Sequence, residues 1–244
     1  GVRLTAAGEI FMAYVRSSLH DLASAVSRIE QLRGLVRGEV PLAAAESVTS
    51  DLLPGVIARF QQRHPGVRFR VRSGGTDTLV AHLMDDTVDL MLAHDPPAHE
   101  GLQRLAELPQ PMCALLRQDH PLAGRASIRL ADCAPYKVAL GEESFGGRRL
   151  IEQVLASTRL KLDVGLVASS VQSMAAYTRQ TGAISFQFEV GTRHEVARGL
   201  VAVPLSDRAL ARTRLVLAAR RGRTLPIAAL RFAEQLRTAL AKAG

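Results

Sequence analysis

Apolar residues near the start of the chain recur at a helical spacing. Thr5 offers an N-cap, Glu9 adds an acid to the first turn, and no proline occurs from there to Leu35, so we expect one long helix. Its apolar side chains follow at alternating steps of four and three residues, as in a coiled-coil seam. The pattern predicts a dimerising helix, with a helix packed on its own domain as the alternative. The seam residues are Val15, Leu19, Leu22, Val26 and Ile29.

Beyond Pro41 the pattern alternates between short apolar runs and amphipathic segments. This order predicts parallel sheets with crossover helices, in two α/β units that enclose a cleft. The expected strands are 39–45, 67–72, 88–93, 112–117, 138–140, 162–167, 183–188 and 215–219, and the expected helices are 51–64, 76–85, 148–157, 171–180 and 228–241.

The composition narrows the class of protein. The net charge of +8 lies in residues 193–244, which hold 11 basic and three acidic side chains. We interpret these as solvated arginines on a strand and a closing helix, because charge alone specifies no partner. No run of about 20 apolar residues and no signal peptide is visible, which favours the cytoplasm. Cys113 and Cys133 match no metal or redox spacing, so we expect small buried hydrophobes.

A search for catalytic, metal and cofactor motifs gives nothing specific. Gly-x-Gly-x-x-Gly, phosphate-loop and Gly-x-Ser-x-Gly patterns are absent. His94 and His99 flank a proline-rich loop, and Asp85, Asp86 and Asp89 lie around a helix end, where solvated acids are common. We therefore predict no metal, no cofactor and no catalytic residue, with His94 as the one eligible acid or base.

Small polar residues follow the predicted strand ends. They occupy 46–50, 73–77 and 144–148, each leading into a helix. Such residues are N-caps in any α/β protein, and they also bind anions at helix N-termini. The first two segments open on the same sheet edge, which favours a ligand site. In the third, two glycines permit close backbone approach and Arg148 offers a bidentate clamp for an anion.

Several short motifs occur in a fixed order along nearly the whole chain. Their combination resembles the LysR-type transcriptional regulators, in which a wing leads through Leu-Thr-x-Ala-Gly into a linker helix. The motifs are Gly1–Gly8, Leu52–Pro54 with Phe60 and Pro65, Val88–Met91, Asp119–Leu122, Leu130–Asp132 and Val171–Gln172 through Ile184.

The resemblance implies an α/β fold with two Rossmann-like lobes of the periplasmic-binding-protein type II kind, preceded by a long dimerising linker helix. It places hinge segments near Leu108–Gln110 and near Ala219. The implied division is a wing remnant with linker helix at 1–36, lobe I at 39–109 plus 219–244, and lobe II at 110–218.

The resemblance also implies that a small molecule binds between the lobes, and a small organic anion is the expected class. Phe188 stands where the family usually has a proline, so it is expected to narrow the pocket or to stack on the ligand. The expected ligand-binding residues are Ser47, Val48, Thr49, Gly75, Thr76, His94, Ser144, Phe145, Arg148, Gln172 and Phe188.

The expected partners are the effector, further copies of the chain in a dimer or tetramer, and promoter DNA through a domain missing from this chain; RNA polymerase is a candidate. The chain lacks an initiator Met, so we expect it to start inside a longer protein. Two rival hypotheses are a solute-binding protein of a transporter, which export would reveal, and an enzyme that uses His94. Neither membrane contact nor enzymatic activity is expected.

Overall fold

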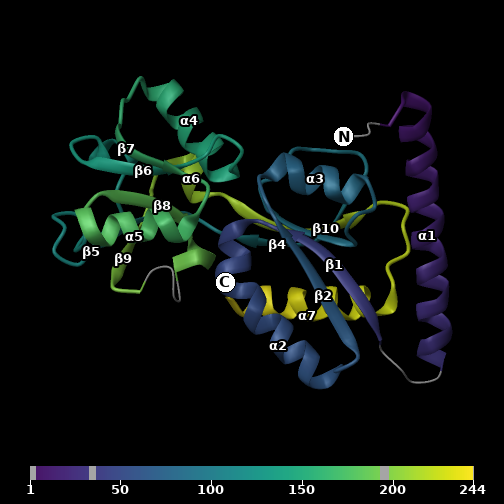
Figure 1. Ribbon diagram of the computed structural model, residues 1–244. Coiled ribbons are helices and arrows are strands. Elements are labelled where there is room, and N and C mark those ends of the chain that lie inside the picture. Colours follow the sequence, from purple (N-terminus) through teal and green to yellow (C-terminus); the bar gives the residue numbers. More distant parts are fainter. Residues whose placement is uncertain (1–3, 33–36, 193–197, 244) are drawn as a thin grey trace.

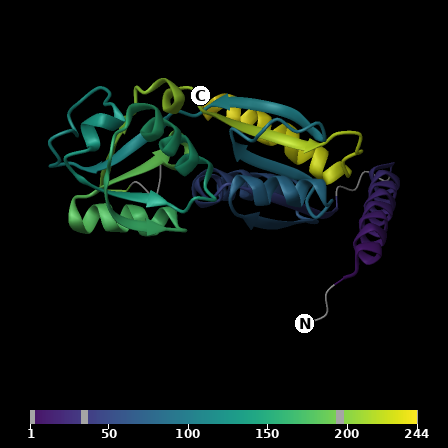
Figure 2. The ribbon, with the colours of Figure 1, turned by 90° about the horizontal axis from the view of Figure 1, so that it is seen from above.

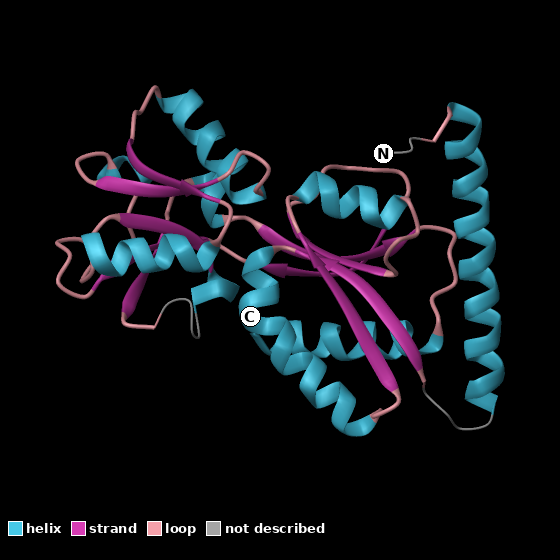
Figure 3. Ribbon diagram, in the orientation of Figure 1, coloured by secondary structure: helices cyan, strands magenta, loops and turns pink. Residues whose placement is uncertain are grey.

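The computed structural model describes residues 4–32, 37–192 and 198–243 (Figure 1). The predicted motif at residues 1–3 and the end of the predicted linker helix at 33–36 lie outside these ranges. Two α/β lobes lie side by side, and the first helix stands alongside one of them (Figures 1 and 3). None of the helices in the described ranges has the length and hydropathy needed to cross a bilayer.

Lobe I is built on a five-stranded sheet in the order β2-β1-β3-β10-β4. β1 pairs in parallel with β2 and β3, as predicted, whereas β10 is antiparallel to β3 and β4. Its elements are β1 (Gly38–Ala44), a π-helical turn (Val48–Leu52), α2 (Leu53–Arg63), β2 (Val67–Ser73), α3 (Thr76–Met84), β3 (Leu90–His94), β4 (Leu102–Pro109), β10 (Arg214–Arg220) and α7 (Ile227–Ala243).

Lobe II repeats this topology in the order β7-β6-β8-β5-β9. β6 is parallel to β7 and β8, and β5 is antiparallel to β8 and β9. Its elements are β5 (Met112–Arg117), a 3-10 turn (Leu130–Cys133), β6 (Lys137–Gly141), α4 (Gly146–Thr158), β7 (Asp163–Ala168), α5 (Val171–Thr181), β8 (Ile184–Phe188), a 3-10 turn (Glu189–Thr192), β9 (Leu200–Pro204) and α6 (Arg208–Ala211).

The chain crosses between the lobes twice, and the second crossing corrects the expected boundary. It leaves the first sheet after β4 and enters the second at β5, then returns between β9 and β10. The expected division at residue 219 was wrong, because β10 pairs along Arg214–Arg220 with β4 and so lies wholly in lobe I. β4 and β9, which the sequence pattern did not predict, are edge strands with several exposed or half-buried positions.

Apolar packing holds each lobe together. In lobe I, the rings of Phe60, Phe69 and Phe232 join α2, β2 and α7, with centroids 4.6–5.7 Å apart in edge-to-face contacts. Cys113 and Cys133 are buried in lobe II, as predicted, and burial raises the pKa of each thiol to about 12. These thiols are therefore packing groups at neutral pH.

Helix α1 (Ala6–Leu32) lies beside lobe I, away from lobe II (Figure 2). The backbone N–H of Gly8 donates to Thr5 Oγ1 at 3.1 Å, which confirms the predicted N-cap. One anchor to lobe I is Arg223, whose guanidinium contacts the carboxylate of Asp21 on α1 and the buried carboxylate of Asp86. Of the predicted seam, Leu19, Leu22, Val26 and Ile29 are 49–62% exposed and Val15 is half-buried.

Candidate functional site

A cavity lies between the lobes, at the carboxyl ends of the strands. Its volume of about 60 Å³ leaves room for only a few water molecules. The lining comes from the turn after β1, the N-termini of α3 and α4, and the ends of β3 and β8. The sequence pattern predicted this position, because the strands of each lobe point their carboxyl ends at the cleft.

Six of the expected ligand-binding residues line this cavity: Ser47, Thr76, His94, Phe145, Arg148 and Phe188. The other five lie elsewhere. Val48 is in the core, Thr49 Oγ1 donates to the carbonyl of Glu46, and Gln172 is exposed on α5. Gly75 and Ser144 meet each other across the cleft, where a Cβ on Gly75 would lie 2.3 Å from the Ser144 carbonyl oxygen.

Lobe I contributes a buried polar cluster. Ser47 Oγ and His94 Nε2 form a hydrogen bond of 3.0 Å, and Ser47, Thr76 and His94 are each at most 4% exposed. Burial lowers the pKa of His94 to about 3, so the imidazole is neutral at physiological pH. His94 Nδ1 is buried and has no hydrogen-bond partner among the described residues. The cluster can therefore offer a ligand a hydroxyl and a neutral ring nitrogen.

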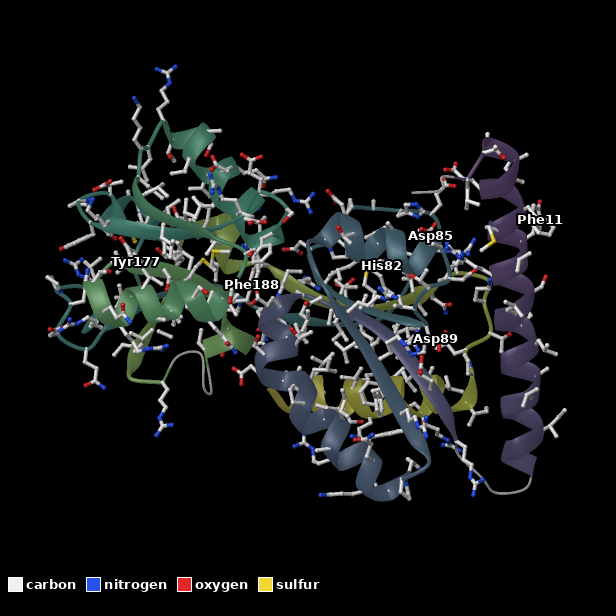
Figure 4. The ribbon with its side chains drawn as sticks, viewed as in Figure 1. Phe11, His82, Asp85, Asp89, Tyr177 and Phe188 are labelled. Carbon is white, nitrogen blue, oxygen red and sulfur yellow. The ribbon has the colours of Figure 1, made fainter. Side chains whose placement is uncertain are left out.

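Phe188 of lobe II stacks on His94 of lobe I. The ring centroids are 3.5 Å apart and the planes are inclined by 12°. Figure 4 shows Phe188 on the side of lobe II that faces lobe I. The aromatic ring at this position therefore narrows the cavity, one of the two roles expected for it.

Arg148 stands at the N-terminus of α4, where its guanidinium is held in place. Nε donates to Glu152 Oε1 at 2.6 Å, and Nη1 donates to the Gly141 carbonyl at 3.2 Å. The arginine side chain is 16% exposed and lines the cavity. Gly146 and Gly147, the first two residues of α4, line it as well, and the first N–H groups of a helix have no partner within the helix.

Glu46 links the two lobes and was missing from the expected site. Its Oε1 accepts a hydrogen bond of 3.1 Å from the backbone N–H of Val171, the first residue of α5. Burial raises the pKa of Glu46, and the N–H of Val171 and the side chain of Ser170 oppose that shift. Glu46 could have been found from the sequence, because it directly precedes Ser47 at the end of β1.

Most of the remaining lining is apolar and could not be recognised from the sequence as part of a site. Met112, Ile151, Met174 and Phe186 lie on different elements of lobe II. Each follows an ordinary core pattern of its strand or helix, and the cavity appears only when the lobes meet. Gln187 also lines the cavity, and its side-chain oxygen accepts a hydrogen bond from the N–H of Phe188.

The two crossings between the lobes pair with each other. The N–H of Gln110 donates to the Thr213 carbonyl at 2.8 Å, and the Thr213 hydroxyl donates to the Gln110 carbonyl. The side-chain oxygen of Gln110 accepts a hydrogen bond of 2.6 Å from the backbone N–H of Val190. Both Gln110 and Thr213 are buried. These hydrogen bonds hold the two crossings between the lobes together.

The fold is that of a two-lobed α/β domain with a cavity in the cleft between its lobes. A family model described as the LysR substrate binding domain matches residues 33–241. The chain belongs to this family, as its motifs predicted, and the family is one of transcriptional regulators.

Two curated relatives support the assignment. The chain is 30% identical over 182 residues to a "Probable nitrogen assimilation transcriptional activator" of Synechococcus elongatus, covering 73% of this chain and 59% of that protein. It is 29% identical over 239 residues to the RuBisCO operon transcriptional regulator of Allochromatium vinosum, covering 96% of this chain and 77% of that protein. The chain thus spans about three fifths of the first relative.

Solved structures share the fold. HinK, a LysR family transcriptional regulator from Pseudomonas aeruginosa, aligns with a TM-score of 0.72 at 23% identity, over 99% of this chain and 82% of that one. The effector binding domain of QuiR in complex with shikimate aligns with a TM-score of 0.68 at 19% identity, over 85% of this chain and 97% of that one. The Synechocystis CcmR regulatory domain in complex with 2-PG aligns with a TM-score of 0.72 at 20% identity, over 83% of this chain and 97% of that one.

Proposed function

We propose that this chain is the effector-sensing and oligomerising part of a LysR-type regulator and that a small organic anion binds between its lobes. The observation that carries the proposal is the interlobe cavity, where Ser47, Thr76 and His94 face Arg148 and the N-terminus of α4. The shikimate and 2-PG complexes of QuiR and CcmR support a small-molecule ligand for a domain of this fold. An organic effector needs more than about 60 Å³, so its entry requires the lobes to move apart.

Effector binding would act by shifting the population of lobe arrangements. The paired crossings at Gln110 and Thr213 would act as a hinge about which the lobes rotate, and Arg223 couples lobe I to α1 through Asp21 and Asp86. A ligand that prefers one arrangement would therefore change how α1 is presented. In the whole protein, we propose that this change reaches a DNA-binding domain at promoter DNA in the cytoplasm, with RNA polymerase as a further partner.

We propose that α1 pairs with α1 of a second copy along its exposed seam. Leu19, Leu22 and Val26 are 49–62% exposed, and burying the exposed part of each would contribute about 1–1.5 kcal/mol. Figure 4 shows Phe11 on the side of α1 that faces away from lobe I. Light scattering should report a dimer or tetramer for the parent and a monomer for a Leu19→Glu, Leu22→Glu variant. An unchanged mass would refute this interface, and Arg16→Glu, off the seam, is the control.

We also propose that the cleft binds without turnover. Ser47 and His94 form a hydrogen bond as a nucleophile and its base would. However, His94 Nδ1 has no orienting carboxylate among the described residues, and a pKa of about 3 makes the ring a poor base. The family assignment likewise favours regulation over the transporter-linked hypothesis.

A thermal-shift screen tests the proposed function. The chain would be heated with small organic acids, amino acids and aromatic compounds, each in excess. A ligand present at 100 times its dissociation constant should stabilise the fold by about 2.7 kcal/mol. We expect a clear hit that Thr76→Ala weakens without unfolding the domain. A library that gives no hit, or hits that Thr76→Ala and Ser47→Ala leave unchanged, would overturn the assignment.

A further inference from the structure

We propose that the effector is a monoanion with an apolar body, such as an aromatic or branched aliphatic monocarboxylate, and that Glu46 rejects ligands with a second anionic group. This inference rests on the proposed function and names the ligand class of the same cleft. Three features of the cavity carry it: one open place for an anion, one built-in carboxylate, and an apolar wall.

The open place for an anion is the N-terminus of α4. Gly146 and Gly147 line the cavity there, and the first N–H groups of a helix have no partner within it. The guanidinium of Arg148 stands beside them, and Glu152 and the Gly141 carbonyl each engage one of its nitrogens. A second observation points to a ligand: the unpartnered Nδ1 of His94, a side chain 3% exposed, belongs to the same lining.

The N-terminus of α5 already has an acidic partner, and α3 carries an acid in its first turn. Glu46 Oε1 accepts the N–H of Val171 at the start of α5. Asp77 lies in the first turn of α3, and Arg149 Nη1 donates to both of its carboxylate oxygens at 3.0 and 3.1 Å. One anionic group of a ligand can thus be compensated at α4, while a second would meet the carboxylate of Glu46 in the same small cavity.

Like charges repel strongly in such a place because little water remains to screen them. Glu46 cannot turn away without giving up the hydrogen bond that joins β1 to α5. Arg148 cannot balance the charge of two anionic ligand groups together with that of Glu46, because it already forms an ion pair with Glu152. We therefore expect a dicarboxylate to bind at least tenfold more weakly than the matching monocarboxylate.

The rest of the lining selects an apolar body. Met112, Leu140, Ile151, Met174 and Phe186 come from lobe II and offer no hydrogen bonds to a ligand through their side chains. Hydroxyl groups placed against them would lose water without replacement, which costs affinity. A planar ring or a branched alkyl group instead gains from the contact.

Calorimetric titration of this chain with benzoate and with phthalate tests the inference, because the two differ by one carboxylate. The parent should bind benzoate at least tenfold more tightly, and Glu46→Gln should reduce that ratio at least fivefold. Glu143→Gln is the control, since Glu143 is exposed in the loop before α4 and lies outside the cavity lining. Thermal melts of both variants check that the fold is retained.

Equal or tighter binding of phthalate by the parent would overturn the inference, as would a ratio that Glu46→Gln leaves unchanged. The inference also fails if the thermal screen yields only uncharged, polyhydroxylated or dianionic ligands whose binding depends on Thr76. The proposed function stands if phthalate or another anion is the better ligand, whereas a screen that yields only uncharged ligands also overturns its anionic effector. If no compound of the screen binds in the cleft, the proposed function fails first and the inference falls with it.

Discussion

The two walls of the cleft differ in chemistry although the two lobes share one strand order. Lobe I presents Glu46, Ser47, Thr76 and His94, all polar, while lobe II presents mainly Met, Leu, Ile and Phe side chains together with Arg148. The same topology therefore supports two kinds of surface. Under the proposed function, lobe I would supply hydrogen bonds to the ligand, and lobe II would supply the arginine that binds its anionic group and the apolar contact.

The largest effect is expected from removing the ring that joins the walls. Phe188 is 6% exposed and stacks on His94, so Phe188→Ala should lower the free energy of unfolding by about 3 kcal/mol. Urea denaturation measures this loss. Phe145→Ala removes a half-buried ring from the same lining and should cost less than half as much. Equal losses would show that the stack contributes nothing.

A pH series isolates the neutral imidazole of lobe I. The pKa of His94 is about 3 in the folded chain against about 6.5 when unfolded, so the unfolded state binds more protons between these values. The contribution of His94 should therefore be constant above pH 6.5 and decrease stability as the pH falls, by about 2 kcal/mol at pH 5. Denaturation of the parent and His94→Gln at pH 7.5 and pH 5 checks this. Parallel losses in the two proteins would contradict it.

A single methyl group added at Gly75 should keep the two walls of the cleft from approaching each other closely. A Cβ at Gly75 would lie 2.3 Å from the Ser144 carbonyl oxygen of lobe II, whereas a Cβ at Gly124, outside the cavity lining, would meet nothing within 4 Å. Gly75→Ala should weaken binding of the ligand found in the thermal screen at least tenfold, and Gly124→Ala should weaken it little. Calorimetry gives both values, and similar affinities for the two variants would refute the close approach of the lobes.

The smallest effect concerns one hydroxyl. Ser47→Ala removes the hydrogen bond to His94 from the cavity lining and should weaken ligand binding about fivefold, which corresponds to about 1 kcal/mol. Thr49→Ala removes a hydroxyl two residues away that donates to the Glu46 carbonyl outside the lining. We expect Ser47→Ala to weaken ligand binding more than Thr49→Ala does, and equal affinities of the two variants would contradict a role for the Ser47 hydroxyl in the cavity.

The sequence predicted lobe I of the site better than lobe II. Ser47 and Thr76 follow strand ends, where parallel topology places side chains at one edge, and the family resemblance added His94 at the end of β3. Met112, Met174 and Phe186 looked like core residues, and their convergence depends on how the lobes meet across the hinge. The strand pattern was recovered except at the edge strands β4 and β9, whose exposed positions weaken the apolar signal. The boundary at which the chain re-enters lobe I was also mispredicted. The apolar pattern of β10 is that of a buried strand and does not indicate to which of the two sheets the strand belongs.

Methyl NMR of the five methionines tests most directly whether a ligand binds between the lobes. Met112 and Met174 line the cavity, Met91 lies in the core of lobe I, and Met12 is on α1. On titration with the ligand of the thermal screen, we expect large saturable chemical-shift changes for the methyl groups of Met112 and Met174 and smaller ones for those of Met91 and Met12. Saturable binding that leaves Met112 and Met174 unmoved would contradict it.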